Sequence, residues 1–317
     1  MQRVSNRPLE GAPGFNDAGL RVMLLHPDGR PVAPGVGGTF WMVLAGHARL
    51  TAAQGQFRVQ AGEWIALTAA HANEVRVEPH GVVVGVTLPP SLQAEWLADP
   101  LAPVFLLARG STREFDRQRA LQLLGLAIEI PGAGAGAGCE VSGGTPLAEA
   151  WQRLISSMQV GCRDLSSACP GYSPLRRRQV FMRFQHALLM MQGRTDRVVR
   201  IAELAHACNF SPCYFSRVFQ QIYGHTPQRI AALHRLERAH ALIVATGIPI
   251  IDVAAECGFE NPSSFARAFR AQYGISASTI RITASKKRTA NGLQSPSRWQ
   301  DVGMVGALAG ANSPALR

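Results

Sequence analysis

The sequence has few charged residues and no apolar run long enough to cross a membrane. Charged residues make up 17% of the 317 positions. The longest apolar runs, such as 81–90 and 239–244, are far shorter than the ~20 residues that a spanning helix needs. The first residues also lack the apolar segment of a secretory signal. We therefore expect a cytoplasmic protein that is not associated with a membrane.

Closely spaced cysteines and common catalytic motifs are also missing. The six cysteines contain no Cys-x-x-Cys pair, so we interpret them as reduced and structural rather than as disulfides or zinc ligands. The sequence has no nucleophile motif and no glycine-rich phosphate loop. We expect no enzyme activity and no cofactor.

Positive charge is abundant but confined to one part of the chain. The formal net charge is +11, and residues 176–288 carry 17 Lys and Arg against 6 Asp and Glu. The rest of the chain is balanced, with 15 residues of each sign. A basic segment beside a neutral one is typical of a protein that binds a polyanion.

The basic segment contains an internal repeat. In each copy an apolar helical face, a short turn and a second helix follow one another, which predicts two helix-turn-helix units. Ser211-Pro212 and Asn261-Pro262 each supply an N-cap and a proline at the first helical position. The matching segments are 205–210 with 254–259, 215–219 with 265–269, and 223–224 with 273–274.

The second helix of each unit has one apolar face and one polar face. Short polar residues and an arginine near a helix N-terminus suit entry into the major groove of DNA, where arginine pairs with guanine. The alternative is that these residues are simply solvated. The polar faces carry Cys213, Ser216, Arg217 and Gln220 in the first unit, and Ser263, Ser264, Arg267 and Arg270 in the second.

The segment between the units predicts one long helix. It begins at Pro227 and ends near Gly247, and its roughly 20 residues would span about 30 Å. That length suits two recognition helices placed about one DNA turn apart, roughly 34 Å.

Residues 178–283 resemble the DNA-binding domain of the AraC/XylS family of transcription regulators. The paired helix-turn-helix units, each with a phenylalanine-rich second helix followed by Tyr-Gly, carry this resemblance. It implies that the following residues contact bases or backbone: Ser211, Cys213, Ser216, Arg217, Asn261, Pro262, Ser263, Ser264 and Arg267.

The N-terminal half predicts short strands separated by turns, at 40–44, 48–51, 56–59, 64–67, 75–77 and 82–86. This spacing favours a barrel or a sandwich, and residues 44–50 and 60–71 resemble the small cupin-like barrel found at the N-terminus of such regulators. Trp41, Phe57, Trp64 and His71 are candidate effector-pocket residues, although aromatic residues on strands are also typical of a core. His47 and His71 stand without the His-x-His spacing of a metal cupin, so we expect no metal site.

The predicted fold class is α+β and multidomain: an N-terminal cupin-like β-barrel with helices, and a C-terminal all-α domain with two helix-turn-helix units. Helical periodicity at 112–130 and 147–160 flanks a glycine-alanine loop at 131–138. By resemblance, those helices form a dimerisation surface. The expected boundaries are 1–163 for the effector or dimerisation domain, 164–175 for the linker, 176–285 for the DNA-binding domain (units at about 200–222 and 249–272), and 286–317 for a disordered tail.

The function that these expectations favour is a sequence-specific transcription regulator, an activator more than a repressor. Its partners would be double-stranded promoter or operator DNA, RNA polymerase, a small organic effector and a second copy of the chain. Two alternatives stay open: a cupin-type metalloenzyme with an appended basic domain, and a non-specific architectural DNA binder.

Overall fold

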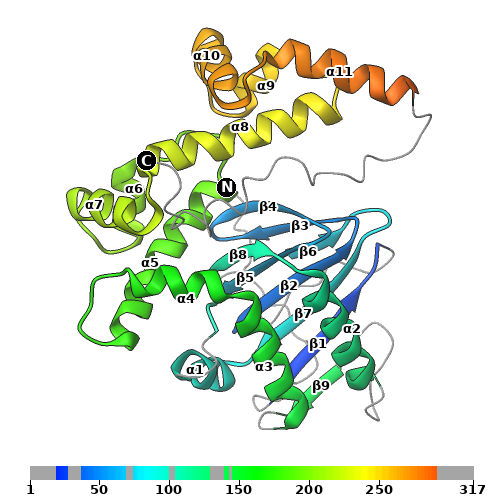
Figure 1. Ribbon diagram of the computed structural model, residues 1–317, viewed down its shortest axis with the longest axis vertical. Helices are drawn as coiled ribbons and strands as arrows, with labels where there is room; N and C mark the ends of the chain where they lie inside the picture. The colour runs from blue at the N-terminus through cyan, green and yellow to red at the C-terminus, as the bar shows by residue number, and fades with distance from the viewer. Residues whose placement is uncertain are drawn as a thin grey trace, which may run out of the picture.

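The computed structural model describes residues 19–27, 37–68, 74–99, 104–128, 139–142 and 145–290. Its N-terminal half consists of antiparallel sheets with helices, and its C-terminal half is helical (Figure 1). The predicted α+β architecture is confirmed at this level. Within the described ranges, none of the helices is both long and apolar enough to cross a membrane.

The described strands form two sheets. One sheet has six strands in the order β8-β5-β2-β7-β1-β9, and the other has three in the order β4-β3-β6. All neighbouring strands are antiparallel. The bounds are β1 Gly19–Leu25, β2 Gly38–Ala45, β3 His47–Ala52, β4 Gly55–Gln60, β5 Glu63–Thr68, β6 Glu74–Val77, β7 Val82–Leu88, β8 Ala108–Ser111 and β9 Cys139–Ser142.

The two sheets pack face to face instead of closing into the predicted barrel. Gly46 (φ 61°) turns β2 into β3, and Gly62 (φ 86°) turns β4 into β5, so the chain changes sheets at two left-handed glycines. Trp41 and Val43 of β2 meet Leu50 of β3 in a buried core between the sheets. Among the described strands, pairing does not continue from one sheet into the other, and the arrangement is a sandwich.

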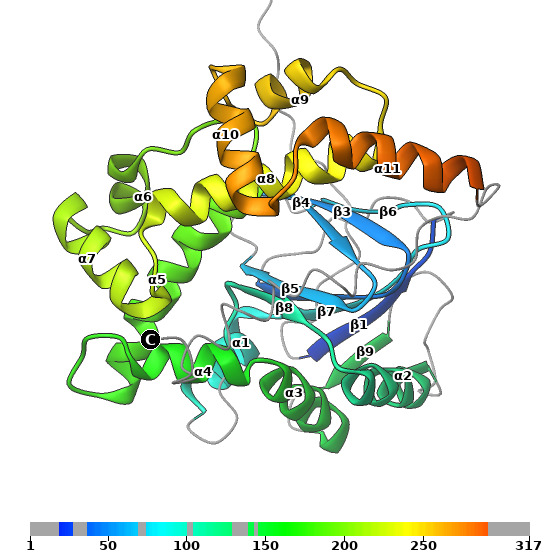
Figure 2. The same cartoon turned by 45° about the horizontal axis from the view of Figure 1, so that its top comes forward.

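Helices cover the outer face of the six-stranded sheet (Figure 2). These are α1 (Pro90–Ala98), α2 (Glu114–Ile128) and α3 (Pro146–Met158). Trp96 of α1 and Trp151 of α3 are buried in the same cluster as Phe40 and Met42 of β2. Strand β2 is therefore buried on both faces, which explains why its sequence is continuously apolar rather than alternating.

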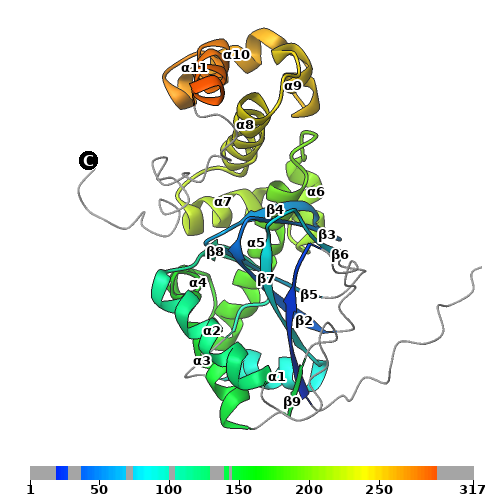
Figure 3. The ribbon, with the colours of Figure 1, turned by 90° about the vertical axis from the view of Figure 1, so that its right-hand side faces the viewer.

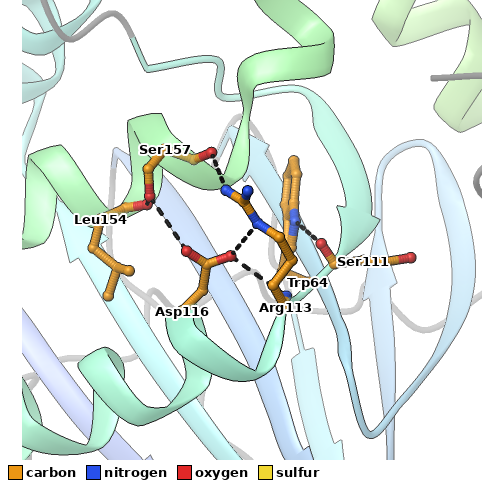
Figure 4. Close-up of polar contacts among 6 residues, drawn as sticks. All are labelled: Trp64, Ser111, Arg113, Asp116, Leu154 and Ser157. Atoms are coloured by element: carbon orange, nitrogen blue, oxygen red, sulfur yellow. Dashed lines mark hydrogen bonds and ion pairs between the residues drawn. The ribbon is translucent and has the colours of Figure 1, made fainter. Parts of the chain in front are cut away.

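A polar network fixes α2 against α3 at the edge of the sheet (Figure 4). Asp116 is buried, and its Oδ2 accepts a hydrogen bond from Arg113 Nε at 3.1 Å. The Ser157 hydroxyl of α3 lies 3.5 Å from the other oxygen of Asp116. Nearby, the indole of Trp64 donates to the carbonyl of Ser111 at 3.2 Å and so ties β5 to β8.

The C-terminal half contains both predicted helix-turn-helix units (Figure 3). Residues 164–167, expected in the linker, are helical because α4 extends to Ser167, and residues 286–290, expected in the tail, belong to α11. Residues 131–138 and 291–317 lie outside the described residues. The helices are α4 Val160–Ser167, α5 Pro174–Gly193, α6 Ile201–Ala207, α7 Pro212–Tyr223, α8 Pro227–Ala245, α9 Ile250–Glu256, α10 Pro262–Tyr273 and α11 Ala277–Ala290.

Helix α5 joins the first helix-turn-helix unit to the N-terminal half. Its Phe181 packs edge-to-face on Phe105, with ring centroids 5.5 Å apart. Gln159, between α3 and α4, holds the same phenylalanine. Its side-chain oxygen accepts from the Phe105 N–H at 2.7 Å, and its side-chain nitrogen donates to the Phe105 carbonyl at 2.8 Å. One continuous core therefore runs from the six-stranded sheet through α5 into α6 and α7, and it ends at Ile230 of α8.

The turn between β3 and β4 also touches the end of α5. A Cβ placed on Gly55 would lie 2.3 Å from the backbone of Gly193. Arg194 donates to the carbonyl of Ala53 at 3.2 Å. The three-stranded sheet thus contacts the helical half through a close backbone approach that only glycine permits.

We expect Gly55→Ala to destabilise the protein more than Gly62→Ala. Both glycines have positive φ, but a Cβ at Gly62 meets no atom within 4 Å. Gly62→Ala should cost about 1–2 kcal/mol of unfolding free energy from the backbone conformation alone. Gly55→Ala should cost about 1–3 kcal/mol more from the clash. Equal losses for the two variants in urea unfolding would contradict the described contact.

Candidate nucleic-acid interface

The two helix-turn-helix units have the same backbone geometry at their turns. Asn209 (φ 55°) and Gly258 (φ 71°) occupy equivalent left-handed positions. Phe210 N–H donates to the Ala205 carbonyl at 2.9 Å, and Phe259 N–H donates to the Ala254 carbonyl at 3.0 Å. The repeat in the sequence is therefore a repeat in three dimensions.

The second helix of each unit starts and stops at equivalent signals. Helix α7 begins at Ser211, whose hydroxyl accepts from Tyr214 N–H, and it has proline at the first position. Helix α10 begins at Asn261, whose Oδ1 accepts from Ser263 N–H at 2.8 Å, and it also has proline there. Both helices end at a left-handed glycine that follows a tyrosine. These are the caps that helix termini favour.

Each second helix buries its phenylalanine face. Phe215 of α7 stacks on Phe184 of α5 at 5.4 Å between ring centroids, and Phe219 is fully buried beside them. Phe265 and Phe269 of α10 are buried in a separate core, which in the described part of the chain is built from α8–α11 and the segments that join them. The apolar sides thus fix which side of α7 and of α10 faces outward.

The predicted DNA-contacting residues lie on the outward sides. Arg217 and Arg267 are exposed at equivalent places, one turn after the helix start, and neither forms an ion pair with any residue in the described ranges. Ser216 is half-buried, and its hydroxyl donates to the Pro212 carbonyl of its own helix at 2.9 Å. The other predicted residues are exposed: Ser211, Cys213, Asn261, Pro262, Ser263 and Ser264.

Sequence reasoning missed the arginines that support the two turns. Arg183 of α5 lies 5.6 Å from the ring centroid of Phe210, and Arg235 of α8 lies 4.5 Å from that of Phe259. Arg235 also donates to the carbonyl of Gly258 at 2.9 Å. No local pattern marks Arg183 and Arg235, because their partners are 23 to 27 positions away in the chain.

The described candidate effector residues are divided between the two faces of the six-stranded sheet. Trp41 and Phe57 are buried between the two sheets. Trp64 is buried on the opposite face of the six-stranded sheet, where it stacks on Phe40 at 5.4 Å. Trp41 pairs with Ile65, the neighbour of Trp64, and successive side chains of a strand point to opposite faces. His71 lies outside the described residues.

A surface pocket of about 430 Å³ lies elsewhere, beside β1 and β7. It is lined by His26, Pro27, Pro79, His80, Gly81 and Val82. Within the described part of the chain, no group of three or more His, Cys, Asp or Glu side chains is placed to hold a metal ion.

The family model that matches this chain lies in its C-terminal part, and the curated relatives match over about a quarter to a third of its length. A family model described as "Helix-turn-helix domain" matches residues 204–282. An HTH-type transcriptional regulator of Mycobacterium tuberculosis is 35% identical over 27% of this chain and 33% of its own length. The HTH-type transcriptional regulator GbdR of Pseudomonas aeruginosa is 31% identical over 29% of this chain and 25% of its own. The match thus spans a quarter to a third of these relatives.

A solved structure is similar over about a third of the chain. It is a probable AraC family transcriptional regulator from Rhodopseudomonas palustris, and it is 27% identical to this chain. The match covers 32% of this chain and 96% of that one, with a TM-score of 0.31. The duplicated, capped helix pairs define a paired helix-turn-helix domain. The family match assigns the same region to a helix-turn-helix domain.

We expect the second unit to lose stability in acid through His240 of α8. Burial lowers the pKa of this imidazole, which packs 4.9 Å from the ring of Tyr273. As pH falls below about 6.5, the unfolded chain binds a proton that the folded chain resists, so stability drops by up to ~1.4 kcal/mol per pH unit until the folded pKa is reached.

The variant His240→Phe retains an aromatic ring but cannot titrate. Its unfolding free energy should depend less on pH than that of the wild type between about pH 7 and pH 5.5. His186, whose pKa burial also lowers, is present in both proteins and cancels in the comparison. Identical pH dependence in the two proteins would contradict the half-buried, neutral state of His240.

Proposed function

We propose that this chain is a sequence-specific DNA-binding transcription regulator. The observation that carries the proposal is the pair of equivalent helices α7 and α10 in a basic domain, each exposing an arginine, Arg217 or Arg267, that forms no ion pair with a described residue. The matched relatives, which are named as transcriptional regulators, support it. The proposed division places the regulatory half at 1–163 and the DNA-binding half at 176–285.

The proposed binding mode places α7 and α10 in two successive major grooves of one duplex. Helix α8 has 19 residues, which corresponds to about 28 Å, close to the ~34 Å of one DNA turn. Arg217 and Arg267 would each pair with a guanine, because the guanidinium presents two parallel donors to O6 and N7. This arrangement makes base contacts the source of specificity.

The starts of the same helices would bind the DNA backbone. The N-terminal N–H groups and the helix dipole favour a phosphate oxygen at such a place. Ser211 and Asn261 cap the two helices and are exposed beside them, and Cys213, Ser263 and Ser264 lie in the first turns. Pro262, without an N–H, would contribute only packing.

For the N-terminal half we propose control by a small effector, by dimerisation, or by both. Exposed apolar residues on α2 support a contact with a second copy: Phe115 is 74% exposed, and Leu121 and Leu126 are also exposed. Such apolar surface is typical of an interface. In this proposal the bound protein activates transcription by contacting RNA polymerase. No arrangement among the described residues favours the metalloenzyme alternative.

The test begins with in vitro selection of duplexes from a random library by the wild-type protein, followed by gel-shift titration at one salt concentration. Arg217→Ala and Arg267→Ala should each weaken binding to the selected duplex by about 1–3 kcal/mol and relax base preference at one position. Arg153→Ala, which removes an exposed arginine from α3, is the matched control and should leave affinity nearly unchanged.

Two outcomes would overturn the proposal. One is unchanged affinity for the selected duplex in both arginine variants. The other is equal affinity of the wild type for selected and random duplexes, which would indicate a non-specific architectural binder.

A further inference from the structure

The second helix-turn-helix unit is held less firmly than the first. The first unit shares its core with α5 and the six-stranded sheet. Among the residues that the structure describes, the core of the second unit consists of residues from α8 onward (Figure 3). Its orientation relative to the first unit therefore depends on α8 and on any contact that joins it to the rest of the molecule.

One such contact lies at the turn of the second unit. A Cβ on Gly258 would be 2.7 Å from Cα of Arg197, in the loop between α5 and α6. Arg235 of α8 holds the same turn from another side through the Gly258 carbonyl. The turn thus fits against the backbone of a loop that belongs to the first unit.

Glu203, in the first turn of α6, fixes the shape of that loop. Both of its carboxylate oxygens bind Arg197, at 3.0 and 2.6 Å, in a bidentate pair. One of them also accepts from Arg194 at 2.6 Å. The hydrogen bonds from Arg197 lower the pKa of Glu203, so it is ionised at neutral pH.

The same bridge reaches the N-terminal half. The second terminal nitrogen of Arg194 donates to the carbonyl of Ala53 in the turn between β3 and β4. Ala53, Arg194, Glu203 and Arg197 therefore form a continuous series of polar contacts that ends at the turn of the second unit.

We propose that Glu203 is a positioning residue that sets the orientation of α10 relative to α7 by holding the loop against which Gly258 packs. It does not touch DNA. Its consequence for DNA rests on the proposed function: the orientation of α10 determines which interval between two half-sites the protein accepts.

The first test does not involve DNA. Hydrogen exchange of the full-length protein is compared for Glu203→Ala and for Glu149→Ala, the latter breaking an exposed glutamate–arginine pair on α3. In Glu203→Ala we expect the amides of residues 255–261 to exchange roughly three- to fivefold faster, as for loss of a partly exposed ion pair, and those of α7 to exchange at the wild-type rate. Equal exchange in the two variants, or faster exchange throughout α6 and α7, would overturn the proposal.

The second test uses duplexes that carry the two half-sites that the wild-type protein selects. The interval between these half-sites is changed one base pair at a time. Removing the negative charge of Glu203 should by itself change binding to every duplex alike, and Glu149→Ala, on α3, should leave the interval preference unchanged. In Glu203→Ala we expect the preference for the best interval to fall by roughly three- to fivefold. Gly258→Ala, which disturbs the same contact from the other side, should reproduce this loss.

The failures of the two proposals are distinguishable. A wild-type interval profile in Glu203→Ala overturns the positioning role, while sequence-specific DNA binding stands. If the wild-type protein selects no duplex but residues 255–261 exchange faster in Glu203→Ala, the proposed function and the predicted interval effect are overturned, while the positioning role is supported.

Discussion

The structure depends on one constraint: helix α8 belongs to two hydrophobic cores at once. Its first turn, at Ile230, closes the core that runs from the six-stranded sheet through α5 into the first helix-turn-helix unit. Its later residues Leu236, Ala239 and Ile243 form the core of the second unit. A single helix thus carries the second unit, and the small contact at Gly258 supplements it.

The helical half was predictable from the sequence because its signals are local. The Ser-Pro and Asn-Pro starts, the Tyr-Gly ends and the phenylalanine spacing specify α7 and α10 without reference to the rest of the chain. The strands from β2 to β7 also followed from short β-prone runs. Their assembly into two sheets did not, because it depends on pairings between distant segments, such as β2 with β7, where Phe40 lies opposite Val86.

The site was only partly predictable for the same reason. Arg217 and Arg267 stand at repeated positions, but Glu203 and Arg235 act through partners that no spacing indicates. The aromatic candidates are separated by the alternation of side chains along the strands. Trp41 and Trp64 lie on neighbouring strands but on opposite faces of the sheet. Their sequence environment, rich in apolar residues, does not distinguish a pocket from a core.

The central claim is that α7 and α10 bind neighbouring major grooves on one side of a duplex. A hydroxyl-radical footprint of the wild-type protein on a selected duplex tests it most directly. The account predicts two protected segments whose centres are about 10–10.5 base pairs apart. A single protected segment, or two segments on opposite sides of the duplex, would contradict it.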